Sequence, residues 1–410
     1  MRIRSTVLVV ILMLIAALSV VVAGCGGTEE TTTTTAAGGD ETTTTAPSTG
    51  EVIEVKIAAQ GPFSGQLSKI GLDALQAVEL AVEEFNESQD QIRVTVEVGD
   101  DVADPAKSAL LAEKFVSDAL VMGVIGPMNS SAGQSALPVL EPAGLALITQ
   151  SMTAVELSQQ GYAVFHRICP RDDAQGAGIA GIMAVDVGAE KVYMIDDKST
   201  YGQGLADEVE GLLRDKYGIT EIQRDQIGPD DKEFSTLITK IRAFDPDVFL
   251  ACIPSPAQYA AIAKQMQAVG YQVQLVGADA ANDKGEFVDA AGDATEGTLF
   301  TSLGPIVTAS TNPATVAFVE KYLDRFGELS MFSAQSYEAA NVLLDAIVRA
   351  YEANGEVTRE GVLEALKATS YDGVLGFTIE FTDQGDLASS GVFIGQVKDG
   401  DFVLVKEANF

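Results

Sequence analysis

Histidine is nearly absent from this sequence, and its scarcity excludes most common catalytic schemes. The 410 residues contain one histidine, His166, in the apolar stretch "VFHRI". Serine hydrolases pair their nucleophile with histidine, and catalytic zinc sites usually need histidine ligands. The stretch "GPFSG" is not a nucleophile elbow, and no Walker loop or G-x-G-x-x-G opens the first predicted helix. We therefore predict that His166 is structural and that the protein is not an enzyme.

Basic residues are also few. The chain has 26 lysines and arginines against 59 aspartates and glutamates, which gives a formal net charge of −33. Nucleic-acid binding depends on clustered lysine and arginine that neutralise phosphates. We therefore expect no nucleic-acid partner, and we interpret the acidity as a solvated surface that favours solubility.

The first of only three cysteines follows a targeting segment. Arginines precede an apolar run over residues 7–23, as is typical of a secretory signal peptide. The end of the run, "VAGC", resembles the lipobox of bacterial lipoproteins, in which the cysteine receives lipid. We predict a lipoprotein signal peptide over residues 1–24, lipidation at Cys25 and a threonine-rich tether over residues 25–51. A plain signal or anchor with an incidental cysteine is the alternative.

Cys169 and Cys252 are the two remaining cysteines. An oxidising compartment would permit a disulfide between them. Isolated cysteines more often serve as small buried apolar residues, and we favour that interpretation.

From Val52 onward, strand-like and helix-like apolar patterns alternate. Strands are predicted over residues 52–59, 92–98, 121–125, 145–148, 192–195, 248–251 and 273–276, and helices over residues 72–85, 105–117, 131–140, 175–187, 202–217, 234–244 and 258–269. Helices at 315–326 and 333–353, a strand near 376–381 and a hairpin of 392–397 with 402–405 follow. This alternation predicts an α/β protein with parallel sheets covered on both faces, and its two series predict two similar lobes.

Ligands of open parallel sheets bind at the carboxyl ends of strands, so the loops there carry the functional information. In "VIGPMNSSAG", Ser130 and Ser131 stand where a predicted strand turns into a helix. Free backbone N–H groups at a helix start favour an anion. The two serines either cap this helix or help to bind a ligand.

Several of these loops, in the same order, resemble the periplasmic leucine/isoleucine/valine-binding proteins, the type I solute-binding components of branched-chain amino-acid ABC transporters. The shared stretches are "GPFSG" with "GLDALQAVELAVEEFN", "DDVADP", "GPMNSSA", "ITQSMTAVELSQQGY", "DDKSTYGQGLAD", "KEFSTLITKIRAFDPDVF" and "GADA". The resemblance spans about residues 52–405. It implies two Rossmann-like lobes joined by a three-stranded hinge, the first lobe comprising residues 52–170 plus 302–390 and the second 171–301 plus 391–410.

The resemblance also implies where the two charges of an amino acid would bind. Ser130 and Thr153 match the family residues that bind the ligand carboxylate, with backbone at Ser151 assisting and Ser131 beside them. An amino-acid site must pair both charges of its ligand after removing them from water.

The opposite end of the ligand is expected to meet the second lobe. Asp279 of "GADA" occupies the position of the family glutamate that pairs the ligand ammonium, and Tyr201 matches a ligand-contacting tyrosine. Ser64 of "GPFSG" lies in the first ligand loop. Two positions depart from the family pattern, because Ser255 replaces a cleft tyrosine and Ile70 an aromatic residue. We therefore expect a remodelled pocket.

The resemblance predicts an extracytoplasmic, lipid-anchored and monomeric solute-binding protein of an ABC importer that binds a small amino acid. Its partners would be the permease and ATPase components, and it would need no cofactor or metal. The alternatives are a ligand-sensing receptor of the same fold, or a binder of another carboxylate or an amide. An acid-based hydrolase using Asp100 and Asp101 is a further alternative, although we interpret these acids, like Asp196 and Asp197, as capping and hinge residues.

Overall fold

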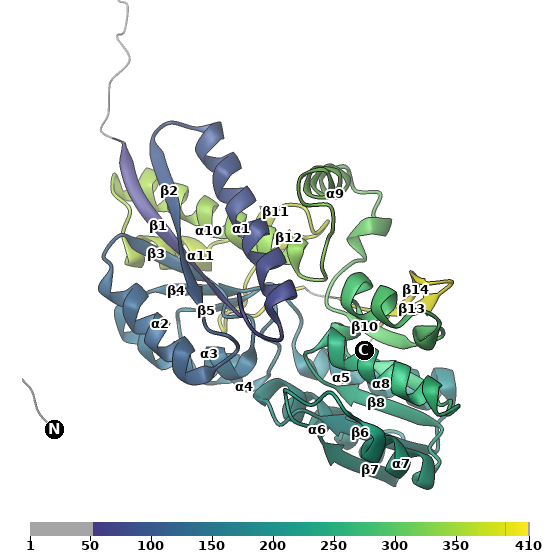
Figure 1. The fold of residues 1–410 in the computed structure, drawn as a ribbon. Helices are drawn as coiled ribbons and strands as arrows, with labels where there is room; N and C mark the ends of the chain where they lie inside the picture. Colours follow the sequence, from purple (N-terminus) through teal and green to yellow (C-terminus); the bar gives the residue numbers. More distant parts are fainter. Residues whose placement is uncertain (1–51, 390, 409–410) are drawn as a thin grey trace, which may run out of the picture. The chain divides into compact units, whose positions relative to one another are not determined.

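The computed structural model describes residues 52–389 and 391–408 of this protein, and it shows an α/β chain folded into two lobes (Figure 1). The predicted signal peptide, tether and Cys25 lie outside the described residues. No helix among the described residues is long and apolar enough to cross a membrane.

The first lobe is built on a five-stranded parallel sheet. Its strand order is β2 (Ile92–Asp100), β1 (Ile53–Gly61), β3 (Val121–Ile125), β4 (Ala146–Thr149) and β5 (Phe165–Arg167). An apolar core covers each face of this sheet. Successive residues of a strand point to opposite sides and so pack into different cores. On β1, Val55 and Ile57 pack into one apolar core, and Ala58 packs into the core on the other face.

Helices from distant parts of the chain cover this sheet (Figure 1). One face carries α1 (Ser68–Ser88) and α10 (Ser333–Asn354), which pack against each other, and Phe318 and Tyr322 of α9 (Pro313–Phe326) join the same core. The other face carries α2 (Pro105–Ser117), α3 (Ser130–Leu140) and the short α4 (Glu156–Gln159). The helix α11 (Arg359–Lys367) contacts α10, β3 and β4.

The second lobe is built on a seven-stranded sheet. Its order is β14 (Asp401–Ala408), β13 (Val392–Lys398), β10 (Leu299–Ser302), β9 (Gln274–Gly277), β8 (Val248–Cys252), β6 (Lys191–Asp196) and β7 (Glu221–Gln226). The strands from β10 to β7 are parallel, and β13 and β14 add an antiparallel hairpin at one edge. The helices of this lobe are α5 (Asp172–Gly181), α6 (Thr200–Asp215), α7 (Ser235–Phe244) and α8 (Pro256–Ala268).

The chain passes between the lobes three times. It leaves the first sheet after β5, returns from β10 to α9, and leaves again after β12 (Thr378–Ile379), which pairs with β11 (Tyr371–Asp372). Neither lobe is therefore a continuous segment of the sequence.

Six of the described α-helices and strands are absent from the predicted ranges: α4, β5, β7, β10, α11 and β11. The strand β7, "EIQRDQ", lies at a sheet edge with no fully buried residue, so it lacks the apolar signal of a central strand. The strand β10 has only four residues, and α11 has only two buried residues. The strand predicted near 376–381 is limited to Thr378–Ile379.

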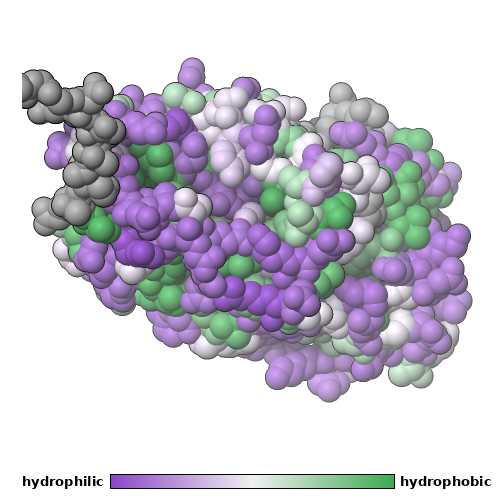
Figure 2. Space-filling model, turned by 90° about the horizontal axis from the view of Figure 1, so that it is seen from above, coloured by the Kyte–Doolittle hydropathy of each residue, from purple (hydrophilic) through white to green (hydrophobic). Residues whose placement is uncertain are grey.

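The surface agrees with the interpretation of the acidic charge. Figure 2 shows mostly hydrophilic residues on the face it displays, with hydrophobic groups scattered among them. Exposed apolar side chains such as Leu110 and Val185 belong to separate elements. Isolated exposed apolar residues of this kind are normal on a solvated surface.

Candidate functional site between the lobes

A pocket lies between the loops that follow the strands of the two lobes. It encloses about 440 Å³ not filled by protein atoms, open solvent at its mouth included. The first lobe contributes Pro62, Leu67, Ile70, Met128, Asn129, Ser130, Ser151 and Phe332, and the second lobe contributes Tyr201, Pro254, Asp279 and Ala280. An apolar wall with a few convergent polar groups is typical of a small-molecule site.

One end of the pocket is formed by the start of α3. Ser130 is the first residue of this helix, and only 2% of it is exposed. Its Oγ accepts a hydrogen bond from Ala154 N at 3.4 Å, and among the described residues no group accepts from its hydroxyl, which can therefore donate to a ligand. The helix start adds backbone N–H groups without intrahelical partners. This end of the site therefore offers donors to an anion.

Ser151 lines the same end of the pocket with its donors already in use. Its N–H donates to Thr149 Oγ1 at 3.2 Å, and its hydroxyl donates to Met128 O at 2.9 Å. Its backbone carbonyl is left as an acceptor, which suits a ligand ammonium better than the carboxylate implied by the resemblance.

Thr153 is completely buried and is not among the residues that line the pocket. Among the described residues, no group accepts from its N–H, and its hydroxyl lies close enough to the Asp172 carboxyl to lower the pKa of that acid. Asp172 N donates to the Thr153 carbonyl at 2.9 Å, which brings the start of α5 to this turn. Burial raises the pKa of the Asp172 carboxyl well above its usual range.

The other end of the pocket carries an acid. Asp279 follows β9 and is 7% exposed. Its Oδ1 accepts from Gln175 Nε2 at 2.7 Å and from the Tyr201 hydroxyl. Burial raises the pKa of Asp279, although these two hydrogen bonds oppose the rise. Both side-chain donors reach Oδ1, and Asp279 lines the pocket, so its carboxylate can meet a cation there.

Besides Thr153, three predicted site residues are not among those that line the pocket, and each makes another contact. Ser131 Oγ accepts from Thr200 N at 2.9 Å, and so joins α3 of one lobe to α6 of the other. Ser255 caps α8 through Gln258 N at 3.3 Å. Ser64 is exposed and donates to Asp100 Oδ2 at 2.5 Å.

The comparisons with known proteins agree with this geometry. A family model described as "Periplasmic binding protein" matches residues 54–401. The chain belongs to the periplasmic binding protein family. The binding protein is 30% identical to Leu/Ile/Val-binding protein homolog 1 of Brucella suis, over 79% of this chain and 85% of that protein. It is 28% identical to the Leu/Ile/Val-binding protein BraC3 of Rhizobium johnstonii, over 86% of this chain and 94% of that protein.

A solved structure of similar architecture is the leucine-binding protein LivK of Thermotoga maritima. It matches with a TM-score of 0.77 at 26% identity, and the match covers 87% of this chain and 99% of that chain. The type I periplasmic binding protein fold predicted from the sequence is therefore confirmed, and the family is one of solute-binding proteins located outside the cytoplasm.

The paired acids of the binding protein cap turns, as predicted. Asp100 accepts from the backbone N–H groups of Phe63, Ser64 and Val102. Asp101 is completely buried and accepts from Ala103 N and the Gln60 amide, and burial raises its pKa to about 6.

His166 and the two described cysteines are structural. The His166 ring packs edge-on against Phe381 with centroids 4.9 Å apart, and burial lowers its pKa to about 4. Cys169 and Cys252 are free and buried, so the alternative of a disulfide between them is wrong. Burial raises the pKa of the Cys169 thiol to about 12, which keeps it protonated and unreactive.

Gln175 and Asp172 were missed by the sequence reasoning. Both lie in "RDDAQG", directly after the first passage between the lobes. Gln175 Nε2 also bonds Thr301 Oγ1 at 2.9 Å, so it orients Asp279 from within the second lobe. A polar cluster at a passage between lobes is a signal that could have identified them.

Proposed function

We propose that this protein is the extracytoplasmic solute-binding component of an ABC importer and that it binds a small α-amino acid, of the branched-chain type, without making or breaking a bond. The observation that carries the proposal is the polarity of the pocket. The start of α3 with Ser130 lines the pocket from the first lobe, and the carboxylate of Asp279 lines it from the second lobe. Desolvated charges need partners, and this arrangement supplies both.

The wall between the two ends supports an aliphatic side chain on the ligand. Leu67, Ile70, Met128 and Phe332 line it, and none of them carries a charge. Burying an aliphatic side chain of this size contributes about 1.5–3 kcal/mol. The names of the relatives from Brucella and Rhizobium point to the same class of ligand.

We further propose the lobe boundaries at residues 52–170 plus 302–390 and 171–301 plus 391–410, with the three passages as a hinge. The two sheets and the three passages between them support this division. Because the pocket takes residues from both lobes, a bound ligand would stabilise the closed arrangement. In this role the protein acts as a monomer and delivers its ligand to permease and ATPase components.

A first test is a thermal-shift panel of amino acids on the chain from Glu51 onward. A ligand present at 100 times its dissociation constant is expected to add about 2.7 kcal/mol to the free energy of unfolding. L-Leucine, L-isoleucine and L-valine should give the largest shifts, with L-aspartate and L-lysine as charged controls of similar size. A panel in which no α-amino acid raises the melting temperature would contradict the proposed ligand class.

A second test concerns attachment to the membrane. If Cys25 is lipidated, the Cys25→Ser variant should move from the membrane fraction to the soluble fraction, because only the acyl chains anchor the mature protein. Fractionation followed by immunoblotting measures this, and Cys169→Ser is the matched control that should stay with the membrane. A Cys25→Ser variant that remains membrane-bound would refute the lipid anchor.

A further inference from the structure

The turn after β4, residues 150–154, carries Thr153, which is proposed to bind the ligand carboxylate. The first half of the turn is held by Thr149, whose Oγ1 accepts from Ser151 N at 3.2 Å and from Met152 N at 3.1 Å. The same hydroxyl donates to Pro127 O at 2.9 Å. The conformation of the second half depends on a different residue.

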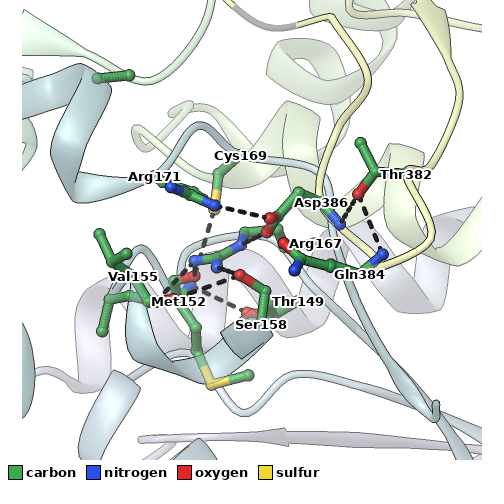
Figure 3. Close-up of polar contacts among 12 residues, drawn as sticks. Thr149, Met152, Val155, Ser158, Arg167, Cys169, Arg171, Thr382, Gln384 and Asp386 are labelled. Carbon is green, nitrogen blue, oxygen red and sulfur yellow. Dashed lines mark hydrogen bonds and ion pairs between the residues drawn. The ribbon is translucent and has the colours of Figure 1, made fainter. Parts of the chain in front are cut away.

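Arg167, the last residue of β5, holds the second half of the turn. It is completely buried, and its Nη1 donates to Met152 O at 2.8 Å and to Ala154 O at 3.0 Å (Figure 3). These two carbonyls flank Thr153 in the sequence. A single guanidinium therefore fixes the peptide unit between Met152 and Thr153 and the unit that follows Ala154.

The planarity of the peptide bond determines what this clamp does to Thr153. The Met152 carbonyl and the Thr153 N–H belong to one trans peptide unit, in which the two groups point in opposite directions. Because Arg167 holds the carbonyl, the N–H is turned away from the guanidinium. No described residue accepts from this N–H, so it remains available to an anion.

Asp386 fixes the guanidinium in turn. Arg167 Nε donates to Asp386 Oδ1 at 2.6 Å, and Arg167 Nη2 donates to Ser158 Oγ at 2.9 Å. The other oxygen of Asp386 accepts from Arg171 Nη1 at 3.2 Å, at the first passage between the lobes (Figure 3). A buried arginine needs such a partner, because an unpaired charge in the interior is costly.

The loop that carries Asp386 can approach β5 only because residue 385 is glycine. Gly385 has a φ of +77°, and its carbonyl accepts from Arg167 N at 2.8 Å. A Cβ at this position would lie 1.8 Å from Phe165 O. The clamp is thus assembled from β5 and from the segment that leads into the third passage.

We propose that Arg167 is a positioning residue for ligand binding, which holds the turn around Thr153 so that its free N–H is available to the ligand carboxylate. Arg167 does not line the pocket and acts only through this turn. The inference rests on the proposed function, because the proposed function identifies the anion as the carboxylate of an amino-acid ligand.

The variant Arg167→Lys tests the proposal, because lysine keeps the charge but cannot hold two carbonyls, a serine and a carboxylate at once. The probes are L-leucine and L-leucinamide, which differ only in the negative charge at the carboxyl end. Calorimetry is expected to show L-leucine binding weakened by about 10-fold or more, as expected when a hydrogen bond to a charged group is lost. L-Leucinamide, which gains less from these donors, should weaken by less than about threefold. Equal losses for both probes would overturn the proposal.

The matched control is Arg359→Lys. Arg359 holds carbonyls in the same lobe, with Nε to Val121 O at 2.9 Å and Nη2 to Asp118 O at 2.7 Å, but at the opposite end of β3 from the pocket. It should leave the preference for L-leucine over L-leucinamide unchanged. If Arg167→Lys fails to fold, Arg167→Gln with Asp386→Asn removes the buried charges together, and the same loss of preference is expected.

Hydrogen exchange of the unliganded protein separates this inference from the proposed function. The Ala154 amide, which donates to Ser130 Oγ in the second half of the turn, should exchange about 10-fold faster or more in Arg167→Lys than in the wild type, because this half of the turn opens locally. Its exchange should not change in Arg359→Lys. Unchanged exchange in Arg167→Lys would overturn the positioning role. A wild-type protein that binds neither probe would contradict the proposed ligand instead, and the exchange rates would then decide the role of Arg167.

Discussion

Asp279→Asn is expected to reduce L-leucine binding by about 30-fold to several thousandfold, corresponding to about 2–5 kcal/mol for a buried charge left without its partner. The asparagine oxygen can still accept from Gln175 and Tyr201, so the surrounding hydrogen bonds survive. The change therefore removes the negative charge opposite the ligand ammonium and little else. Isothermal titration calorimetry at neutral pH measures the loss.

The desamino analogue of leucine, 4-methylpentanoate, shows whether the ammonium is the group concerned. This probe has no positive charge, so Asp279→Asn should leave its affinity unchanged or improve it. Asp283→Asn is the matched control: Asp283 is also a buried acid of the second lobe, but it caps Glu286 N at 2.7 Å and does not line the pocket. Equal losses for leucine and its desamino analogue would refute the ammonium assignment and favour a ligand without an amino group.

The pKa of Asp279 gives the wild type a pH dependence that the Asp279→Asn variant should lack. Burial raises this pKa, so the free protein takes up a proton, and leucine binding weakens, as the pH falls through the raised value. A raised carboxyl pKa stabilises the fold below the unfolded value near 3.9, and this contribution is lost as the pH rises through the folded value. At neutral pH the unliganded Asp279→Asn variant should thus be at least as stable as the wild type, which thermal unfolding can verify.

Removal of the donors at the other end should have the second-largest effect. Ser130→Ala deletes a hydroxyl of a residue that lines the pocket, and Thr153→Val deletes a buried hydroxyl while keeping the shape of the side chain. Each donor to a charged group contributes about 1.5–3 kcal/mol, so each variant should bind L-leucine about 10- to 150-fold more weakly. Calorimetry on the purified variants checks both values.

A control on the same helix distinguishes ligand binding from helix capping. Ser135 lies one turn after Ser131 in α3, bonds the Ser131 carbonyl at 3.4 Å and does not line the pocket. Ser135→Ala should bind leucine as the wild type does. If Ser130→Ala and Thr153→Val also bind normally, the serines after β3 only begin a helix, and the carboxylate must bind elsewhere.

The sequence predicted the elements whose side chains are apolar at a regular spacing. The central strands β1, β3, β6 and β8 and the helices α1, α2 and α10 appear within a few residues of their predicted bounds, because both faces of these sheets are buried. The elements it missed, such as the edge strand β7, carry few buried residues. Such elements form because they pair with neighbouring elements in the fold. Their own sequences therefore show no regular spacing of apolar residues.

For the candidate site, the motifs indicated Ser130, Ser151, Tyr201 and Asp279, and the fold places all four around one pocket. The motifs did not show how hydrogen bonds divide the roles. Ser255 follows a strand, as Ser130 does, but its side chain caps a helix. Gln175 orients Asp279 although the two residues are 104 positions apart in the sequence. Such contacts join separate loops, so no local pattern records them.

By itself the sequence determined the class of fold, the charged character of the surface and the types of residue that could bind an amino-acid ligand. These properties depend on composition and on local spacing. Only the tertiary structure decided which of these residues have unoccupied donors and acceptors. It placed Arg167 against the turn of Thr153 and brought Asp386, 219 residues away, to the same guanidinium. The chain passes three times between the lobes, so the partners in one buried hydrogen-bond network come from segments far apart in the sequence. These polar groups must pair with one another because they are buried away from water, and burial is decided by the tertiary structure.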